Sequence, residues 1–172
     1  MRGRAHLKLA LVALGAVACG SSTPPKGGPF PADVANFDYV LDGHTIALKQ
    51  GTYVEKTGDG ADDFIATDLT NARLDADFDG DEATDAAVVV THDEGPLKVH
   101  YLVVILQRAD GHHAQTSIAL GKNVLVQNLA NGPNRSIEVT YLGHEEGVPE
   151  DAPPTTKLTK SFKVADGKLV AR

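Results

Sequence analysis

The chain has 172 residues, of which 23 are acidic and 16 are basic, so its formal net charge is −7 at pH 7. This acidic balance argues against nucleic acid or an anionic lipid surface as the main partner, because like charges repel. The single cysteine excludes an intrachain disulfide, so the stability of the folded domain must come from a hydrophobic core and from any bound metal ion.

Residues 1–18 have the three parts of a bacterial secretion signal. Basic side chains come first, and residues 7–18 form an apolar run that is too short to cross a membrane as a helix. Residues 16–19 read AVAC and resemble the lipobox that precedes the lipidated cysteine of bacterial lipoproteins. We therefore expect cleavage before Cys19 and lipidation of its thiol. The alternatives are cleavage by ordinary signal peptidase, which leaves a soluble protein, and an uncleaved anchor.

Acyl chains on Cys19 would hold the protein at a membrane without any membrane-binding surface on the domain itself. Gly20 stands where an aspartate commonly retains enteric lipoproteins in the inner membrane, which favours the outer membrane, facing the periplasm or the cell surface. Residues 19–36 are rich in glycine, proline, serine and threonine, as is typical of a flexible tether. Because residues 1–18 carry three basic and no acidic side chains, their removal changes the formal charge from −7 to −10.

Residues 37–172 are expected to form a single all-β domain of about nine or ten short, mainly antiparallel strands, arranged as a sandwich or barrel. Turn dipeptides separate β-favouring runs, and the first of them predict a three-stranded meander over residues 37–56. No window sustains apolar residues at helical spacing, so little helix is expected beyond one turn around 61–66. The remaining strand-like runs are 63–69, 86–92, 98–108, 114–120, 123–128, 136–142, 156–165 and 169–171.

The apolar pattern of these runs predicts how deeply each strand is buried. Residues 86–90 and 102–106 are continuously apolar, which indicates central strands that are buried on both faces. Residues 137–141 alternate between apolar and polar side chains and predict a half-buried strand. The few aromatic side chains are expected to fill the core, except that Phe78 is left undecided because it lies inside an acidic segment.

Acidic residues concentrate in one part of the chain. Residues 59–94 hold twelve of the 23 acidic residues and a single Arg or Lys, Arg73, and the densest part, 75–85, runs directly into the predicted central strand. Alternating aspartates in a tight, glycine-containing turn can direct several oxygens at one centre, and calcium takes about six to eight oxygen ligands. The pattern predicts a calcium-binding loop. The alternative is a solvated acidic turn that binds nothing.

The preferred register of this loop has four aspartate ligands. Asp77, Asp79, Asp81 and Asp85 occupy loop positions 1, 3, 5 and 9, as in calcium loops that connect directly to a strand. Position 6 is then Glu82, which is unfavourable if the turn requires a positive φ at that residue. Four aspartates within nine residues repel one another, and a divalent cation would relieve that repulsion.

A second register starts two residues earlier. Asp75, Asp77 and Asp79 then occupy positions 1, 3 and 5, and Gly80 takes position 6, where an EF-hand loop has its glycine. This register lacks the bidentate glutamate of position 12, which is Ala86, and no helices are predicted on either side.

Residues 77–90 resemble a segment of the form GDLNGDGxxDAAVVL in a family of uncharacterised bacterial secreted proteins and lipoproteins. The resemblance continues through residues 101–104, 118–124 and 154–162, so it covers about residues 37–165. Three positions depart from the family pattern: Glu82 replaces the loop glycine, Asn123 follows Lys122 where the family has Asp-Arg, and residues 152–153 replace a pair of cysteines found in many members. The resemblance implies the β fold and the calcium loop, and it implies no activity.

Residues typical of an active site are not apparent. No serine stands in a nucleophile elbow, there is no phosphate-binding glycine loop, and the histidines, including the adjacent pair His112-His113 and His144, lack zinc-site spacing. We therefore expect a lipid-anchored, non-enzymatic envelope protein, a calcium-stabilised structural or protein-interaction module. The alternatives are a binding module or inhibitor that acts on an envelope enzyme or peptidoglycan and, third, a metal-assisted hydrolase. The residues identify neither a partner nor an oligomeric state.

Overall fold

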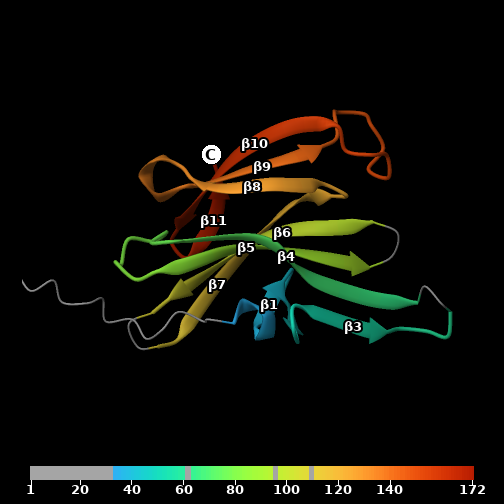
Figure 1. The fold of residues 1–172 in the computed structure, drawn as a ribbon, viewed down its shortest axis with the longest axis horizontal. Helices are drawn as coiled ribbons and strands as arrows, with labels where there is room; N and C mark the ends of the chain where they lie inside the picture. Colours follow the sequence, from blue (N-terminus) through green and yellow to red (C-terminus); the bar gives the residue numbers. More distant parts are fainter. Residues whose placement is uncertain (1–32, 61–62, 95–96, 109–110) are drawn as a thin grey trace, which may run out of the picture.

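The computed structural model describes residues 33–60, 63–94, 97–108 and 111–172 (Figure 1). The leader, Cys19 and all but the end of the predicted tether lie outside the described residues. Within the described part of the chain, none of the helices has the length and apolar character needed to span a membrane.

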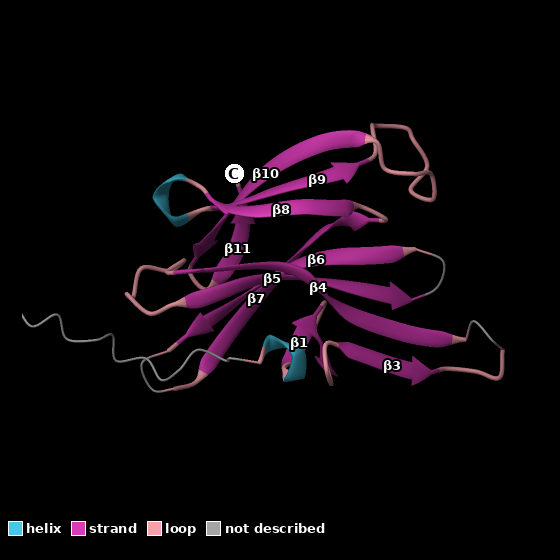
Figure 2. Ribbon diagram, in the orientation of Figure 1, coloured by secondary structure: helices cyan, strands magenta, loops and turns pink. Residues whose placement is uncertain are grey.

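The domain is all-β, as predicted, with eleven strands and two short 3₁₀ helices in the described residues (Figure 2). The strands are β1 (Asp38–Leu41), β2 (His44–Ala47), β3 (Thr52–Lys56), β4 (Phe64–Ala76), β5 (Asp85–Glu94), β6 (Lys98–Gln107), β7 (His113–Lys122), β8 (Leu125–Asn131), β9 (Ile137–Gly143), β10 (Thr156–Ala165) and β11 (Lys168–Ala171). The 3₁₀ helices are η1 (Val34–Asn36) and η2 (Pro133–Arg135).

The strands form three antiparallel sheets, and two of them make a sandwich. One has the order β3-β4-β5-β6-β7, the second has the order β11-β10-β9-β8, and β1 pairs with β2 in a separate hairpin. The four-stranded sheet stacks over the five-stranded sheet (Figure 1). At one edge the Leu169 N–H of β11 donates to Thr116 Oγ1 of β7 at 3.0 Å, so hydrogen bonding as well as apolar packing joins the two sheets.

The continuously apolar runs are the central strands, as predicted. Every residue of 86–90 and 102–106 is at most 1% exposed. Successive side chains of a strand point to opposite faces, and Ala87 and Val89 pack into the core between the two large sheets. Val88 and Val90 face the other way and pack against the β1–β2 hairpin. The five-stranded sheet is therefore covered on both faces, which explains why these runs do not alternate.

The predicted meander over residues 37–56 is wrong at its third strand. β3 pairs with β4, and a single bridge, Lys49↔Thr52, connects β3 to the segment before it. Gln50 and Gly51 both have positive φ and turn the chain away from β2, and the Gly51 carbonyl accepts from the Leu69 N–H of β4. The expected helical turn around 61–66 is also wrong for residues 64–66, which begin β4, while residues 61–62 lie outside the described ranges.

Candidate metal centre

The acidic loop joins two neighbouring strands of the five-stranded sheet. β4 ends at Ala76 and β5 begins at Asp85, so the loop covers residues 77–84. Carboxylates of the loop accept hydrogen bonds from its own backbone, in the manner of Asx turns. The bonds are Gly80 N to Asp77 at 2.6 Å, Asp81 N to Asp79 at 3.3 Å and Ala83 N to Asp81 at 2.9 Å. These short-range bonds fix the orientation of the three carboxylates relative to the loop backbone.

Three of the predicted ligands converge. Asp77, Asp79 and Asp85 each offer a carboxylate oxygen, and these atoms all lie within 4.8 Å of one another. Because calcium–oxygen distances are about 2.3 to 2.6 Å, two oxygens on one ion are at most about 5 Å apart. The spacing of the three carboxylates therefore suits a single divalent cation.

The other two predicted ligands lie outside this cluster. Asp81 is exposed, and one of its oxygens is 3.9 Å from an Arg108 nitrogen. Asp75 belongs to β4, and its carboxylate is 2.8 Å from Arg73 Nε. The structure thus brings together positions 1, 3 and 9 of the preferred register, and it does not bring Asp75 to the centre as the second register requires.

The backbone of the loop also bears on the register. Gly80 has a φ of +95° and Glu82 a φ of +68°. Glu82, at position 6 of the preferred register, therefore has the left-handed backbone conformation that favours glycine.

Asp85 is the most buried member of the cluster, at 0% exposure. Its two oxygens accept hydrogen bonds from Phe78 N at 2.8 Å and Gln107 N at 2.9 Å. Burial raises the pKa of its carboxyl group to about 6, the two backbone N–H groups oppose that rise, and the nearby charges of Asp79 and Asp81 add to it. A cation beside Asp85 would favour its ionised form.

Two arginines neutralise the cluster in this structure. An Arg108 guanidinium nitrogen forms a hydrogen bond and ion pair with Asp79, and Arg135 Nε lies 3.5 Å from Asp77. Neither arginine was predicted from the sequence, because Arg108 follows β6 and Arg135 lies in η2, far along the chain from the loop. The only sequence signal was indirect: twelve acidic residues with a single Arg or Lys among them require compensation from elsewhere.

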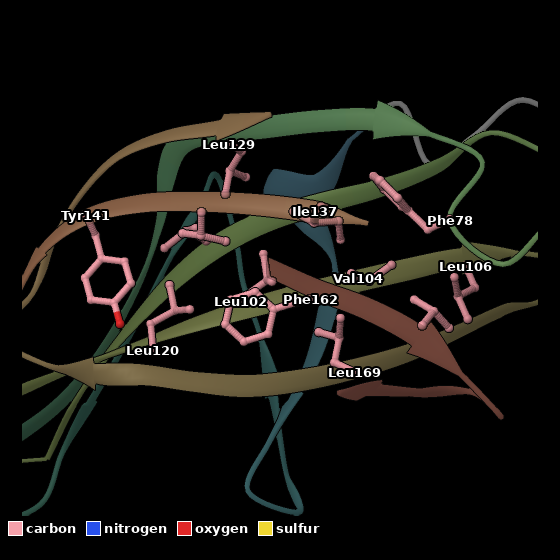
Figure 3. Packing of buried hydrophobic residues seen from close by; sticks show 14 of the residues in the cluster. Phe78, Leu102, Val104, Leu106, Leu120, Leu129, Ile137, Tyr141, Phe162 and Leu169 are labelled. Atoms are coloured by element: carbon pink, nitrogen blue, oxygen red, sulfur yellow. The ribbon is translucent and has the colours of Figure 1, made fainter. Parts of the chain in front are cut away.

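Phe78, left undecided by the sequence, is 1% exposed and belongs to the core between the two large sheets (Figure 3). The residue lies between two aspartates of the cluster, so its ring anchors the loop to the core while its neighbours direct their carboxylates at the centre. The acidic loop is therefore a fixed part of the sandwich.

The other polar residues considered in the sequence have structural contacts. Ser117 Oγ donates to the Val40 carbonyl at 3.1 Å, and Ser136 Oγ donates to the Pro133 carbonyl at 2.8 Å. A ring nitrogen of His144 is 2.8 Å from the Ala152 carbonyl oxygen, which places that histidine in the loop before β10. These contacts connect loops and strands to one another.

The fold and the carboxylate cluster define the class: an all-β sandwich with a three-aspartate oxygen centre at the junction of β4 and β5. No family model, no curated protein and no solved structure matches this chain. The resemblance drawn from the loop sequence therefore stays a prediction, and functional inference rests on the residues and their geometry.

Proposed function

We propose that this chain is a lipid-anchored, non-enzymatic protein of the bacterial envelope, in which calcium bound at the acidic loop stabilises a structural or protein-interaction domain. The observation that carries the calcium part is the convergence of Asp77, Asp79 and Asp85 within 4.8 Å. The anchor rests on Cys19 at the end of the leader and on the tether that follows it.

The donor set suits calcium. Carboxylate oxygens are hard ligands, which favour calcium or magnesium, whereas zinc usually takes nitrogen or sulfur as well. Asp77, Asp79 and Asp85 would hold the ion. Asp81 contacts the same Arg108 nitrogen as Asp79, so its carboxylate lies beside the cluster. A bound cation would replace the charge that the two arginines now supply.

A structural role for the ion is favoured over a catalytic one by the attachment of the loop to the fold. Asp85 is buried and accepts hydrogen bonds from the backbone of Phe78 in the loop and Gln107 in β6, and the Phe78 ring is part of the core. An ion held by these residues would tie the β4–β5 turn to β6. Stability is therefore the property most directly coupled to calcium.

Thermal unfolding of the full-length protein tests this proposal. We expect millimolar calcium to raise the melting temperature relative to chelator, and we expect Asp79→Ala to lower the melting temperature and remove the calcium response together. Asp75→Ala is the matched control, because Asp75 lies beside the loop and outside the cluster. An unchanged melting temperature with calcium, or an equal loss of response in both variants, would contradict the calcium site.

A further inference from the structure

One strand of the four-stranded sheet places a lysine on its core-facing side. Lys160 in β10 pairs with Val139 in β9, and Val139 is 0% exposed. Directly opposite residues in an antiparallel pair point to the same face of the sheet, so Lys160 shares its face with Val139 and with Leu158 and Phe162 on its own strand. The Lys160 side chain is nevertheless exposed, so its ammonium group lies at the solvent-accessible rim of this face.

A second polar group lies beside this lysine. Tyr141 in β9 is 1% exposed, and none of the described residues forms a hydrogen bond with its hydroxyl. Lys160 Nζ is 5.8 Å from the centre of the Tyr141 ring. Figure 3 shows the ring extending from β9 with its hydroxyl directed toward the opposite sheet, near Leu120. Among the described residues, the buried side-chain atoms without a partner are His100 Nδ1 and Gln107 Oε1, so the Tyr141 hydroxyl is accessible at the pocket surface and available to a ligand.

Both residues line a pocket of about 290 Å³ between the end of β7 and the strands β9 and β10. This volume is close to the lower limit of small-molecule sites, about 300 Å³. The apolar side chains of the pocket are Leu120, Val124, Val148 and Leu158. Leu120 comes from the five-stranded sheet and Leu158 from the four-stranded sheet, so the pocket has an apolar body with a cation and a hydroxyl donor beside it.

The other charges of the pocket have partners. Lys122 Nζ is 3.1 Å from a Glu150 oxygen, and Glu145 accepts from Thr156 Oγ1 at 3.3 Å. Among the described residues, no acidic side chain lies within ion-pair distance of Lys160. Lys160 is thus the cation of this pocket that can bind an anion without first breaking an existing ion pair.

We propose that this pocket binds a small monocarboxylate with an apolar body. The carboxylate accepts hydrogen bonds from Lys160 Nζ and the Tyr141 hydroxyl, and the apolar body packs on Leu120, Val124 and Leu158. A charge-assisted bond from the lysine and the hydroxyl bond would select the carboxylate, because the corresponding alcohol lacks the negative charge. The ligand class is that of short and medium-chain fatty acids and their aromatic analogues.

Lys160 has a competing explanation. β11 pairs with residues 162–165 of β10, and the Arg172 N–H donates to the Ser161 carbonyl, which leaves residues 156–160 with an unpaired edge. Inward-pointing charges are one way in which proteins protect such edges from pairing with another chain. Edge protection accounts for the lysine, but it does not account for the Tyr141 hydroxyl or for the apolar pocket next to it, so binding is the better explanation.

Calorimetric titration with hexanoate, 1-hexanol and acetate tests the proposal. The protein is the full chain with Cys19→Ser, so that no attached acyl chain can enter the pocket. We expect hexanoate to bind at least ~10-fold more tightly than either of the other probes, since 1-hexanol lacks the carboxylate and acetate lacks the apolar body. Hexanoate binding no tighter than 1-hexanol binding would overturn the proposal.

Three substitutions locate the site. Lys160→Met keeps the apolar stem and removes the charge, Tyr141→Phe removes only the hydroxyl, and Lys157→Met removes a charge from the outer face of the same strand. We expect Lys160→Met to weaken hexanoate binding by at least ~10-fold and Tyr141→Phe by at least ~3-fold, both with the melting temperature preserved. Lys157→Met should bind hexanoate as tightly as the parent protein does. Unchanged binding in Lys160→Met, or equal losses in Lys160→Met and Lys157→Met, would refute the site.

Discussion

Arg135 Nε lies 3.5 Å from the Asp77 carboxylate, and this contact joins the two large sheets. Arg135 belongs to η2, which connects β8 to β9 in the four-stranded sheet, whereas Asp77 begins the loop after β4 in the five-stranded sheet. The proposed calcium site thus lies where the two sheets meet. Changes to its charge should affect both the stability of the sandwich and the affinity for calcium.

The first prediction concerns this arginine. In chelator, Arg135→Gln should lower the free energy of unfolding by less than about 1 kcal/mol, because the side chain is 56% exposed and exposed ion pairs contribute little. The same change should raise the affinity for calcium, because the cation no longer competes with a guanidinium for Asp77. Calorimetric titration measures the affinity. Arg73→Gln is the control: it removes the partner of Asp75 and should leave the affinity for calcium unchanged. A weaker affinity for calcium in Arg135→Gln would contradict the prediction.

The second prediction is a pH dependence of calcium binding. Burial raises the pKa of Asp85 to about 6, so this carboxyl group is increasingly protonated as the pH falls through 6. Calcium requires the ionised carboxylate and must displace the proton. The affinity for calcium should therefore fall between pH 7 and pH 5, a range in which carboxyl groups with ordinary pKa values change little. Titrations at several pH values check this, and equal affinity at pH 7 and pH 5 would count against Asp85 as a ligand.

The same group also affects stability without calcium. The folded pKa of Asp85 lies above its ordinary value of 3.8, so the folded state binds more protons than the unfolded state between about pH 4 and pH 6. The contribution of Asp85 to stability is therefore largest below pH 4 and is lost as the pH rises through 6. Denaturant unfolding in chelator should show the stability of the protein, relative to Asp85→Asn, decreasing over this range. An increase in this relative stability between pH 4 and pH 6 would contradict a raised pKa of Asp85.

The third prediction concerns the strained position of the loop. Glu82 has a φ of +68°, a conformation that costs an ordinary residue about 1–2 kcal/mol, while glycine adds unfolded-state entropy worth about 0.5–1 kcal/mol. Glu82→Gly should therefore stabilise the protein by about 0.5–1 kcal/mol. Thr84→Gly, at a loop residue without positive φ, should destabilise it. Denaturant unfolding of both variants gives the comparison, and destabilisation of similar size in both would show that the backbone strain is absent.

The fourth prediction tests the attachment of the loop to the core. Phe78→Ala removes a ring that is 1% exposed and should lower the free energy of unfolding by about 3–5 kcal/mol. Phe64→Ala is the control, because that ring is 40% exposed and should contribute much less. Calcium affinity should fall in Phe78→Ala along with stability, since the ring holds the neighbouring carboxylates in place. Equal losses of stability in the two variants would mean that Phe78 does not anchor the loop.

The sequence predicted the position of the acidic loop because that depends on adjacent residues. The alternation of aspartates around Gly80, and the apolar run that starts at Ala86, are local features, and they placed a turn before a central strand. The sequence did not show whether Asp75 or Asp85 lies beside Asp77, because that depends on where β4 ends. β4 extends to Ala76, which keeps Asp75 in the strand beside Arg73, and this length is set by pairing with β5.

The predicted three-stranded meander was correct at its first turn and wrong in the pairing of its third strand. Asp42-Gly43 correctly predicted the turn between β1 and β2, because a two-residue turn is encoded by its own residues. The partner of β3 was predicted wrongly, since pairing with β4 depends on a strand that begins at Phe64, beyond the loop after Lys56, and on the turn at Gln50. Local patterns do not specify such pairings.

Sequence alone determined the all-β class, the two central strands and the place where carboxylates crowd, because hydrophobic period, turn chemistry and charge density are properties of neighbouring residues. Only the tertiary structure decided which of the crowded carboxylates meet, that Arg108 and Arg135 neutralise them, and that Lys160 and Tyr141 share a pocket. Each of these relationships joins residues from different strands or connections. Pairing of neighbouring strands brings Arg108 close to the acidic loop and Lys160 close to Tyr141, and packing of one sheet on the other brings Arg135 to Asp77. No local pattern records this pairing and packing.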